Sequence, residues 1–153
     1  MSKFVSLLLG VVLLASCSDK IDDDVLTSTA LPMAGTQAVP AKPVAGTGTI
    51  DAFYNRTTKT LYYTVKWNSL TGAPATGFGI YGPAAPGFNN ANKQAFSTTG
   101  LTAAGTYTGT VFIDGTVLKE EELLMGEYYV MIPTATYAAT AGGEIRGQIK
   151  FVQ

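Results

Sequence analysis

A period-two alternation of apolar and polar side chains constrains the fold of this chain more than any other feature. It is clearest in TLYYTVKW at residues 60–67, where every second residue is aliphatic or aromatic. Successive side chains of a β-strand point to opposite faces of a sheet, so this pattern predicts a strand with one buried face. The apolar face would carry Leu61, Tyr63, Val65 and Trp67, and the exposed face Tyr62, Thr64 and Lys66.

Similar strand patterns recur along the rest of the chain. Residues 47–54 and 106–113 alternate with threonines on one face. EYYVMI at residues 127–132 is a more continuous apolar run after its first residue, which is typical of a central strand. In the segment 144–151 we expect Ile145, Ile149 and Phe151 to point inward and Arg146, Gln148 and Lys150 to point outward.

One helical segment interrupts the strands. VLKEEELLMG at residues 117–126 places leucines on one side and three glutamates on the other, and it ends in Gly126, a residue type that ends helices. Turn residues such as Asp114-Gly115 separate the strands. The sequence therefore predicts an all-β fold, an immunoglobulin-like antiparallel β-sandwich with one short helix near 117–125, formed as one domain by residues 31–153.

Residues 1–16 have the features of a signal peptide. Lys3 precedes the apolar run Phe4–Leu14, which is shorter than the roughly 20 residues that span a bilayer. The LASC sequence that ends at Cys17 resembles the lipobox of bacterial lipoproteins, in which the cysteine is acylated, and Cys17 is the single cysteine of the chain. We therefore expect a lipid anchor at Cys17, with an ordinary secretory signal as the alternative.

An acidic segment follows at residues 17–30. It contains four aspartates and little apolar surface, so we expect Cys17 to be followed by a flexible tether. Ser18 would be the second residue of the mature chain and is not the aspartate that retains lipoproteins at the inner membrane. The sequence therefore favours the outer membrane, with the domain facing the periplasm or the cell surface.

The remaining side chains exclude several classes of function. From Val25 onward, seven acidic and eight basic residues are scattered without a basic stripe, so nucleic-acid binding has no electrostatic support. The chain has no histidine, and acylation of Cys17 would leave no thiol, which removes the usual general base, the thiol nucleophile and most zinc sites. A two-carboxylate glycosidase is the enzymatic alternative, but the acidic residues are too scattered to nominate a pair. We therefore expect no catalytic activity, metal or cofactor.

Residues 31–151 resemble the CHRD domain, the module named after chordin and also found in bacterial envelope proteins. The similar phrases are LPMAGTQAVP at residues 31–40, the strand that opens with LYYTV at 61–65, and LTG at 70–72. GGEIRGQI at 142–149 is the most specific of them. The resemblance implies an immunoglobulin-like sandwich and a secreted or surface location. It implies no enzymatic activity, because none is established for the bacterial members.

The chain departs from the family where CHRD domains commonly carry three histidines, an arrangement suited to a transition metal. Those places fall here on Gly79, Tyr81 and Pro133. The resemblance therefore implies that a histidine-dependent metal site is absent. It also implies that residues 77–81 end a strand and that residues 82–87 form its exit loop.

Aromatic residues outside the inward faces are the candidate binding residues. The chain contains eight tyrosines, seven phenylalanines and one tryptophan, more than the inward faces require. Exposed rings stack on sugars or anchor protein interfaces, whereas the alternative is that they cover the edges of the sandwich. The candidates are Phe78, Tyr81, Phe88 and Tyr137, with Tyr62 as a further outward aromatic residue.

Glu144 and Arg146 require a separate interpretation. As alternate residues of one strand they share a face, so they either pair with each other or with neighbouring loops, or Arg146 binds a ligand. Two functional hypotheses follow from the sequence. The first is a lipid-anchored, non-catalytic binding or adhesion module for a protein or glycan. The second is a structural envelope component without a soluble ligand.

Overall fold

The computed structural model describes residues 24–152, so the predicted signal peptide, Cys17 and residues 18–23 lie outside the described residues. The described chain forms eight strands, one short α-helix and two single turns of 3₁₀-helix. The elements are β1 (Val25–Ala34), η1 (Gly35–Gln37), β2 (Thr47–Asn55), β3 (Thr60–Asn68), β4 (Gly79–Tyr81), β5 (Asn92–Ala95), β6 (Gly105–Phe112), α1 (Glu120–Leu124), β7 (Tyr129–Ile132), η2 (Ala139–Ala141) and β8 (Ile145–Gln148).

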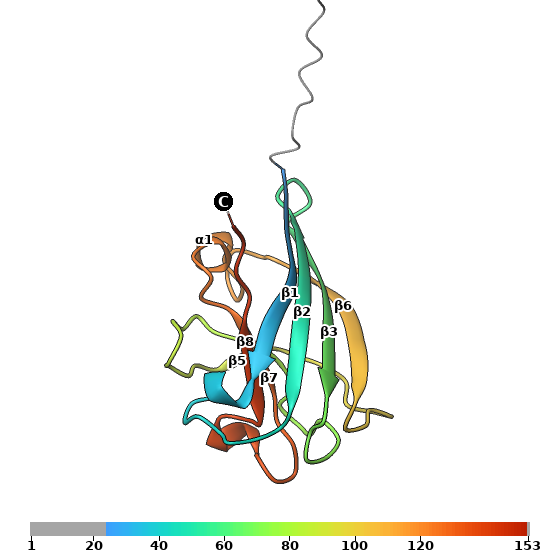
Figure 1. The fold of residues 1–153 in the computed structure, drawn as a ribbon. Helices are drawn as coiled ribbons and strands as arrows, with labels where there is room; N and C mark the ends of the chain where they lie inside the picture. The colour runs from blue at the N-terminus through green and yellow to red at the C-terminus, as the bar shows by residue number, and fades with distance from the viewer. Residues whose placement is uncertain (1–23, 153) are drawn as a thin grey trace, which may run out of the picture.

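All eight strands belong to one antiparallel sheet in the order β5-β4-β7-β8-β1-β2-β3-β6. The sheet curls until it is nearly a barrel (Figure 1). The two halves of the sheet meet where β8 pairs with β1 at a single register position, Ala34 with Arg146. Side chains join the two ends of the sheet, because Phe96, just after β5, stacks on Tyr107 of β6 with ring centroids 4.7 Å apart.

The predicted all-β antiparallel class is confirmed, but the immunoglobulin-like sandwich is not, because the strands form one continuous sheet. The predicted helix is confirmed in a shorter form at residues 120–124. Gly126 follows it with a φ of +73°, a backbone conformation that favours glycine. The strand β5 has no counterpart among the predicted elements, since NKQA carries no apolar alternation.

The extent of the tether is corrected by the structure. Residues 25–30 were expected to be flexible, but they form the first part of β1 and pair with β2. The physical reason is that this segment also alternates. Leu26 packs against the core, and the Ser28 hydroxyl donates a hydrogen bond of 2.8 Å to the Lys150 carbonyl.

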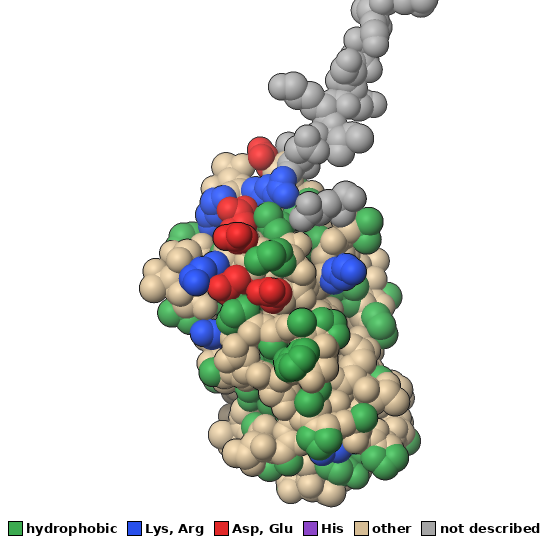
Figure 2. All heavy atoms as spheres, turned by 90° about the vertical axis from the view of Figure 1, so that its left-hand side faces the viewer, with side chains coloured by type: hydrophobic (Ala, Val, Ile, Leu, Met, Phe, Trp, Pro, Cys, Tyr) green, Lys and Arg blue, Asp and Glu red, His purple; other side chains and the backbone are tan. Residues whose placement is uncertain are grey.

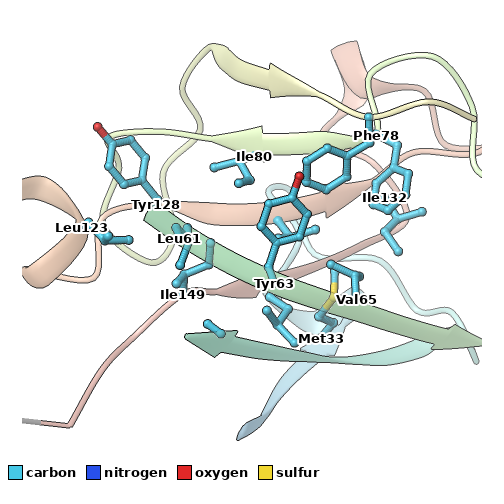
Figure 3. Packing of buried hydrophobic residues seen from close by; sticks show 14 of the residues in the cluster. Met33, Leu61, Tyr63, Val65, Phe78, Ile80, Leu123, Tyr128, Ile132 and Ile149 are labelled. Atoms are coloured by element: carbon cyan, nitrogen blue, oxygen red, sulfur yellow. The ribbon is translucent and has the colours of Figure 1, made fainter. Parts of the chain in front are cut away.

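The core lies inside the curled sheet and is closed at one end by α1 (Figure 3). The predicted inward faces are confirmed: the four apolar residues of β3 are at most 4% exposed, as are the apolar residues of the last segment. These residues are Leu61, Tyr63, Val65, Trp67, Ile145, Ile149 and Phe151.

Charged side chains gather at one end of the domain. On the face seen in Figure 2, acidic and basic side chains intermingle near the start of β1 and become sparse toward the opposite end. The loops at that opposite end carry a single charged residue, the partly buried Lys42; they span residues 35–46, 69–78, 97–104 and 133–143. Within residues 24–152, no helix is long and apolar enough to cross a membrane.

Candidate functional site

The outer face of strands β1, β2, β3 and β6 is an open sheet surface. Antiparallel register aligns its outward side chains in rows across the strands. Three successive rows are formed by Thr27, Phe53, Tyr62 and Thr110, then by Asp51, Thr64 and Thr108, and then by Thr49, Lys66 and Thr106.

The first two rows line a shallow groove of about 280 Å³. Its aromatic wall is formed by Phe53 and Tyr62, which are 40% and 44% exposed. The two rings are 5.7 Å apart and meet edge to face at 71°, so each ring holds the other in place. Threonines of β1, β3 and β6 surround the pair. The groove therefore joins an aromatic wall to a surface of hydroxyl groups.

Asp51 supplies the charged end of the groove. Its carboxylate accepts hydrogen bonds from the Ala30 backbone N–H at 2.8 Å and from Lys66 Nζ at 3.0 Å. The Ala30 N–H is available because β1 bulges between Ser28 and Leu31, which turns it out of the ladder. These two hydrogen bonds lower the pKa of Asp51 below its ordinary value, the backbone bond contributing most. Asp51 is thus held as a fixed carboxylate acceptor.

Two of the predicted binding residues are buried, and the expectation that they are exposed is wrong. Phe78 is fully buried and packs edge to face against Trp67, Phe96 and Tyr107. Tyr81 is 7% exposed, stacks on Tyr129, and donates its hydroxyl hydrogen to the Gly77 carbonyl. Phe78 belongs to the main core, whereas Tyr81 clusters with Tyr129 and Met131 under Ala84 and Ala139. Neither ring offers a stacking surface to a ligand.

The two other aromatic candidates lie outside the groove. Phe88 is 68% exposed, in the loop at residues 82–91 that follows β4. Tyr137 is partly buried in the loop after β7, with Lys42 Nζ 6.0 Å from its ring centroid. The predicted exposure of Phe88 is confirmed, and ligand binding by either residue stays a prediction.

Arg146 lies buried beneath the loop at residues 82–91. It is 1% exposed, and its guanidinium lies 3.6 Å from the ring centroid of Tyr129. The pattern correctly placed Arg146 on the outer face of its strand, but this loop covers that face. Burial lowers the pKa of Arg146 below its ordinary value. Its four hydrogen bonds run to Phe88 O (2.7 Å), Asn89 Oδ1 (3.4 Å), Ala85 O (3.4 Å) and Gln148 Oε1 (3.2 Å).

Glu144 holds a different part of the chain and does not pair with Arg146. Its fully buried carboxylate accepts hydrogen bonds from the Thr71 backbone N–H at 2.9 Å, from the Thr71 hydroxyl, and from the Thr134 hydroxyl at 2.8 Å. It therefore ties the loop after β3 to the loop after β7. These contacts favour the interpretation in which both residues pair with neighbouring loops.

The three places of the family histidines lie on one face of β4 and β7. Gly79 and Tyr81 alternate on β4, and Pro133 alternates with Met131, the register partner of Gly79. A Cβ atom at Gly79 would lie 2.2 Å from the Gln94 carbonyl oxygen, so the backbone of β5 occupies the space that a side chain at this position would need. Among residues 24–152, no three His, Cys, Asp or Glu side chains are grouped in a way that suits a metal ion.

Phe53, Asp51 and the threonine rows were not among the candidate binding residues named from the sequence. Their signal was present, because TGTIDAFY and TYTGTVFI alternate and so place these residues outward. What the alternation does not give is the register between strands. The pairing of β2 with β3 brings Phe53 beside Tyr62. The pairing of β3 with β6 brings Thr64 beside Thr108, which is 44 positions away in the sequence, and so completes the groove.

Taken together, the chain forms an all-β module with a nearly closed antiparallel sheet and one open, hydroxyl-rich face. The model of the CHRD domain family matches residues 29–149, and the chain belongs to this family. The resemblance seen in the sequence is thereby confirmed, and membership favours a binding-type domain. No curated protein and no solved structure matches the chain.

Proposed function

We propose that this protein is a lipid-anchored, non-catalytic module of the bacterial envelope that binds a glycan in the groove on the outer face of β1, β2, β3 and β6. The observation that carries the proposal is the exposed pair of Phe53 and Tyr62 beside threonine hydroxyls and the Asp51 carboxylate. A sugar ring has an apolar C–H face and a rim of hydroxyls. An aromatic wall next to fixed polar groups is complementary to both parts.

The dimensions of the groove favour a glycan over a protein partner. A volume of about 280 Å³ lies near the lower end of small-ligand sites, which measure about 300–1,000 Å³. A stable protein interface needs about 800 Å² per partner with a well-buried apolar centre. Thr64 Oγ and Thr108 Oγ lie 3.3 Å apart, and either hydroxyl can donate or accept, as recognition of sugar hydroxyls requires.

The anchor and the location rest on the N-terminal sequence. The lipobox-like LASC and the acidic residues after it support acylation of Cys17 and attachment to the outer membrane. The domain begins at Val25, so a short tether would hold it close to the membrane. Lipid attachment would be tested by metabolic labelling with a clickable fatty acid, using Cys17→Ser as the control. Labelling of the Cys17→Ser chain would contradict the assignment.

Glycan binding is tested with the chain from residue 18 onward, which omits the acylated cysteine. A glycan array identifies ligands, and titration calorimetry compares Tyr62→Ala with Tyr62→Phe. We expect Tyr62→Ala to weaken binding at least about tenfold and Tyr62→Phe to retain it, since the phenyl ring preserves stacking. Phe88→Ala, exposed but outside the groove, is the matched control.

Two results would contradict the proposal. Equal loss of binding in Tyr62→Ala and Phe88→Ala would place the site elsewhere. No retained glycan, together with stable association with other envelope proteins in pull-downs, would support the second hypothesis, a structural envelope component.

A further inference from the structure

The two edges of the sheet are built differently. The edge strand β5 has four residues, contains Lys93, and shifts register against β4 between Ile80 and Tyr81. The opposite edge strand, β6, has eight residues in unbroken register with β3. Its sequence GTYTGTVF contains no charged residue and no proline. Figure 1 shows no strand beyond it.

Edge strands usually carry features that prevent pairing with another chain. Short length, bulges and lysines block an edge, and β5 has all three. β6 has none of them, although its row of backbone N–H and C=O groups on the free side remains available for a further strand. We propose that β6 pairs antiparallel with β6 of a second copy of this chain, in a register centred on Thr108.

The sequence of β6 is complementary to itself in this register. Thr108 would face its own copy and Thr106 would face Thr110, which gives three Thr–Thr pairs of the kind that stabilise antiparallel sheets. The three threonines are exposed in the single chain. No charged residue of β6 would meet its own copy, so the pairing carries no like-charge repulsion.

The larger side chains meet small partners in the same register. Tyr107 would lie opposite Gly109, and Val111 opposite Gly105. Phe112, which is 60% exposed, would lie opposite the exposed Ala104. A register centred on Gly109 would instead set Tyr107 against Val111. The register centred on Thr108 therefore packs the edge without crowding.

This pairing has a geometric consequence for the anchored protein. β6 ends at the same end of the domain at which β1 begins, because β1, β2, β3 and β6 alternate in direction. Antiparallel pairing of two copies therefore places their tethers at opposite ends of the dimer, with both grooves on one continuous face. If Cys17 is acylated as proposed above, the dimer suits copies that project from two facing surfaces.

Disulfide cross-linking tests the register in the full chain, purified in detergent micelles. Thr108→Cys should form a covalent dimer on mild oxidation, because the two side chains would be directly opposite. Thr106→Cys and Thr110→Cys should cross-link efficiently only when the two chains are mixed. The wild-type chain, whose single cysteine is Cys17, and Thr49→Cys, on the outer face of an interior strand, are the controls.

A second variant tests the same pairing without thiol chemistry. Thr108→Lys should leave thermal unfolding unchanged, since Thr108 is exposed, and should weaken self-association at least about tenfold in sedimentation. The proposal is overturned if Thr108→Cys yields no more dimer than Thr49→Cys. Cross-linking of Thr106→Cys with itself would also overturn it. Thr108 also lines the groove, but both experiments are made without glycan, so a negative result overturns the dimer without contradicting glycan binding.

Discussion

Replacing Arg146 with alanine should strongly destabilise the domain. The guanidinium fixes the loop at residues 82–91 through the carbonyls of Phe88 and Ala85, and it stacks on Tyr129 at 3.6 Å. Truncation leaves these acceptors without their donor beneath a covered surface and opens a cavity next to Tyr129. The side chain is 1% exposed, so water reaches the gap only if the loop moves.

The magnitude follows from the four hydrogen bonds. Two of these hydrogen bonds, to Phe88 O at 2.7 Å and to Gln148 Oε1 at 3.2 Å, have ordinary hydrogen-bond lengths. A hydrogen bond from a charged donor contributes about 1.5–3 kcal/mol to the free energy of unfolding. The recovered hydration of a buried cation offsets part of this sum, which leaves a net loss of about 3 kcal/mol. For a domain of this size, that loss lowers Tm by about 10 °C.

Thermal unfolding by circular dichroism measures this loss, and chymotrypsin cleavage after Phe88 reports whether the loop has been released. Lys66→Ala is the control, because its ion pair with Asp51 is exposed and is expected to contribute about 0–1 kcal/mol. A Tm equal to that of Lys66→Ala, with the loop still protected, would refute the structural role of Arg146. It would then favour the interpretation of Arg146 as a ligand-binding residue.

Two other changes have clear expected outcomes. Phe78→Ala should lower the free energy of unfolding by about 3–5 kcal/mol, because Phe78 is fully buried among three aromatic rings. Phe88→Ala should change it by about 0.5 kcal/mol or less, because Phe88 is exposed. Urea unfolding compares the two variants, and equal midpoints would contradict the burial of Phe78. Asp51 has a lowered pKa in the folded state, so its stabilisation is present above the ordinary value of 3.8 and is lost as pH falls through the folded pKa. The Tm difference between wild type and Asp51→Asn should therefore stay constant from pH 7 to about pH 4 and shrink as the pH falls further, and a difference that does not shrink below pH 4 would contradict this linkage.

The sequence predicted the long strands well because their two faces differ in polarity. β2, β3 and β6 alternate over eight or nine residues, and burial follows that alternation residue by residue in β3. The start of β1 was missed because the neighbouring aspartates indicated a solvated tether, whereas pairing with β2 stabilises the segment from Val25. Local composition does not reveal a strand whose stability comes from a partner twenty or more residues away.

The candidate site was harder to predict because it depends on contacts between segments. Phe78 and Tyr81 stand among glycines and prolines, which is typical of an exposed loop, yet Phe78 packs in the core and Tyr81 packs against Tyr129 beneath residues of distant loops. Arg146 occupies an outward position of β8 that the loop at residues 82–91 covers from above. Outward phase in a strand therefore does not ensure exposure when a long loop folds back over the sheet.

Nuclear magnetic resonance mapping of the glycan site tests the central claim most directly. A glycan retained on the array would be titrated into the isotope-labelled chain from residue 18 onward, and backbone amide shifts would be followed. We expect the largest changes on β2 and β3 around Asp51, Phe53, Tyr62 and Thr64, with the loop at residues 82–91 unaffected. Changes centred on Phe88 or Tyr137, with the outer face of β2 and β3 unchanged, would contradict the claim that the groove binds the glycan.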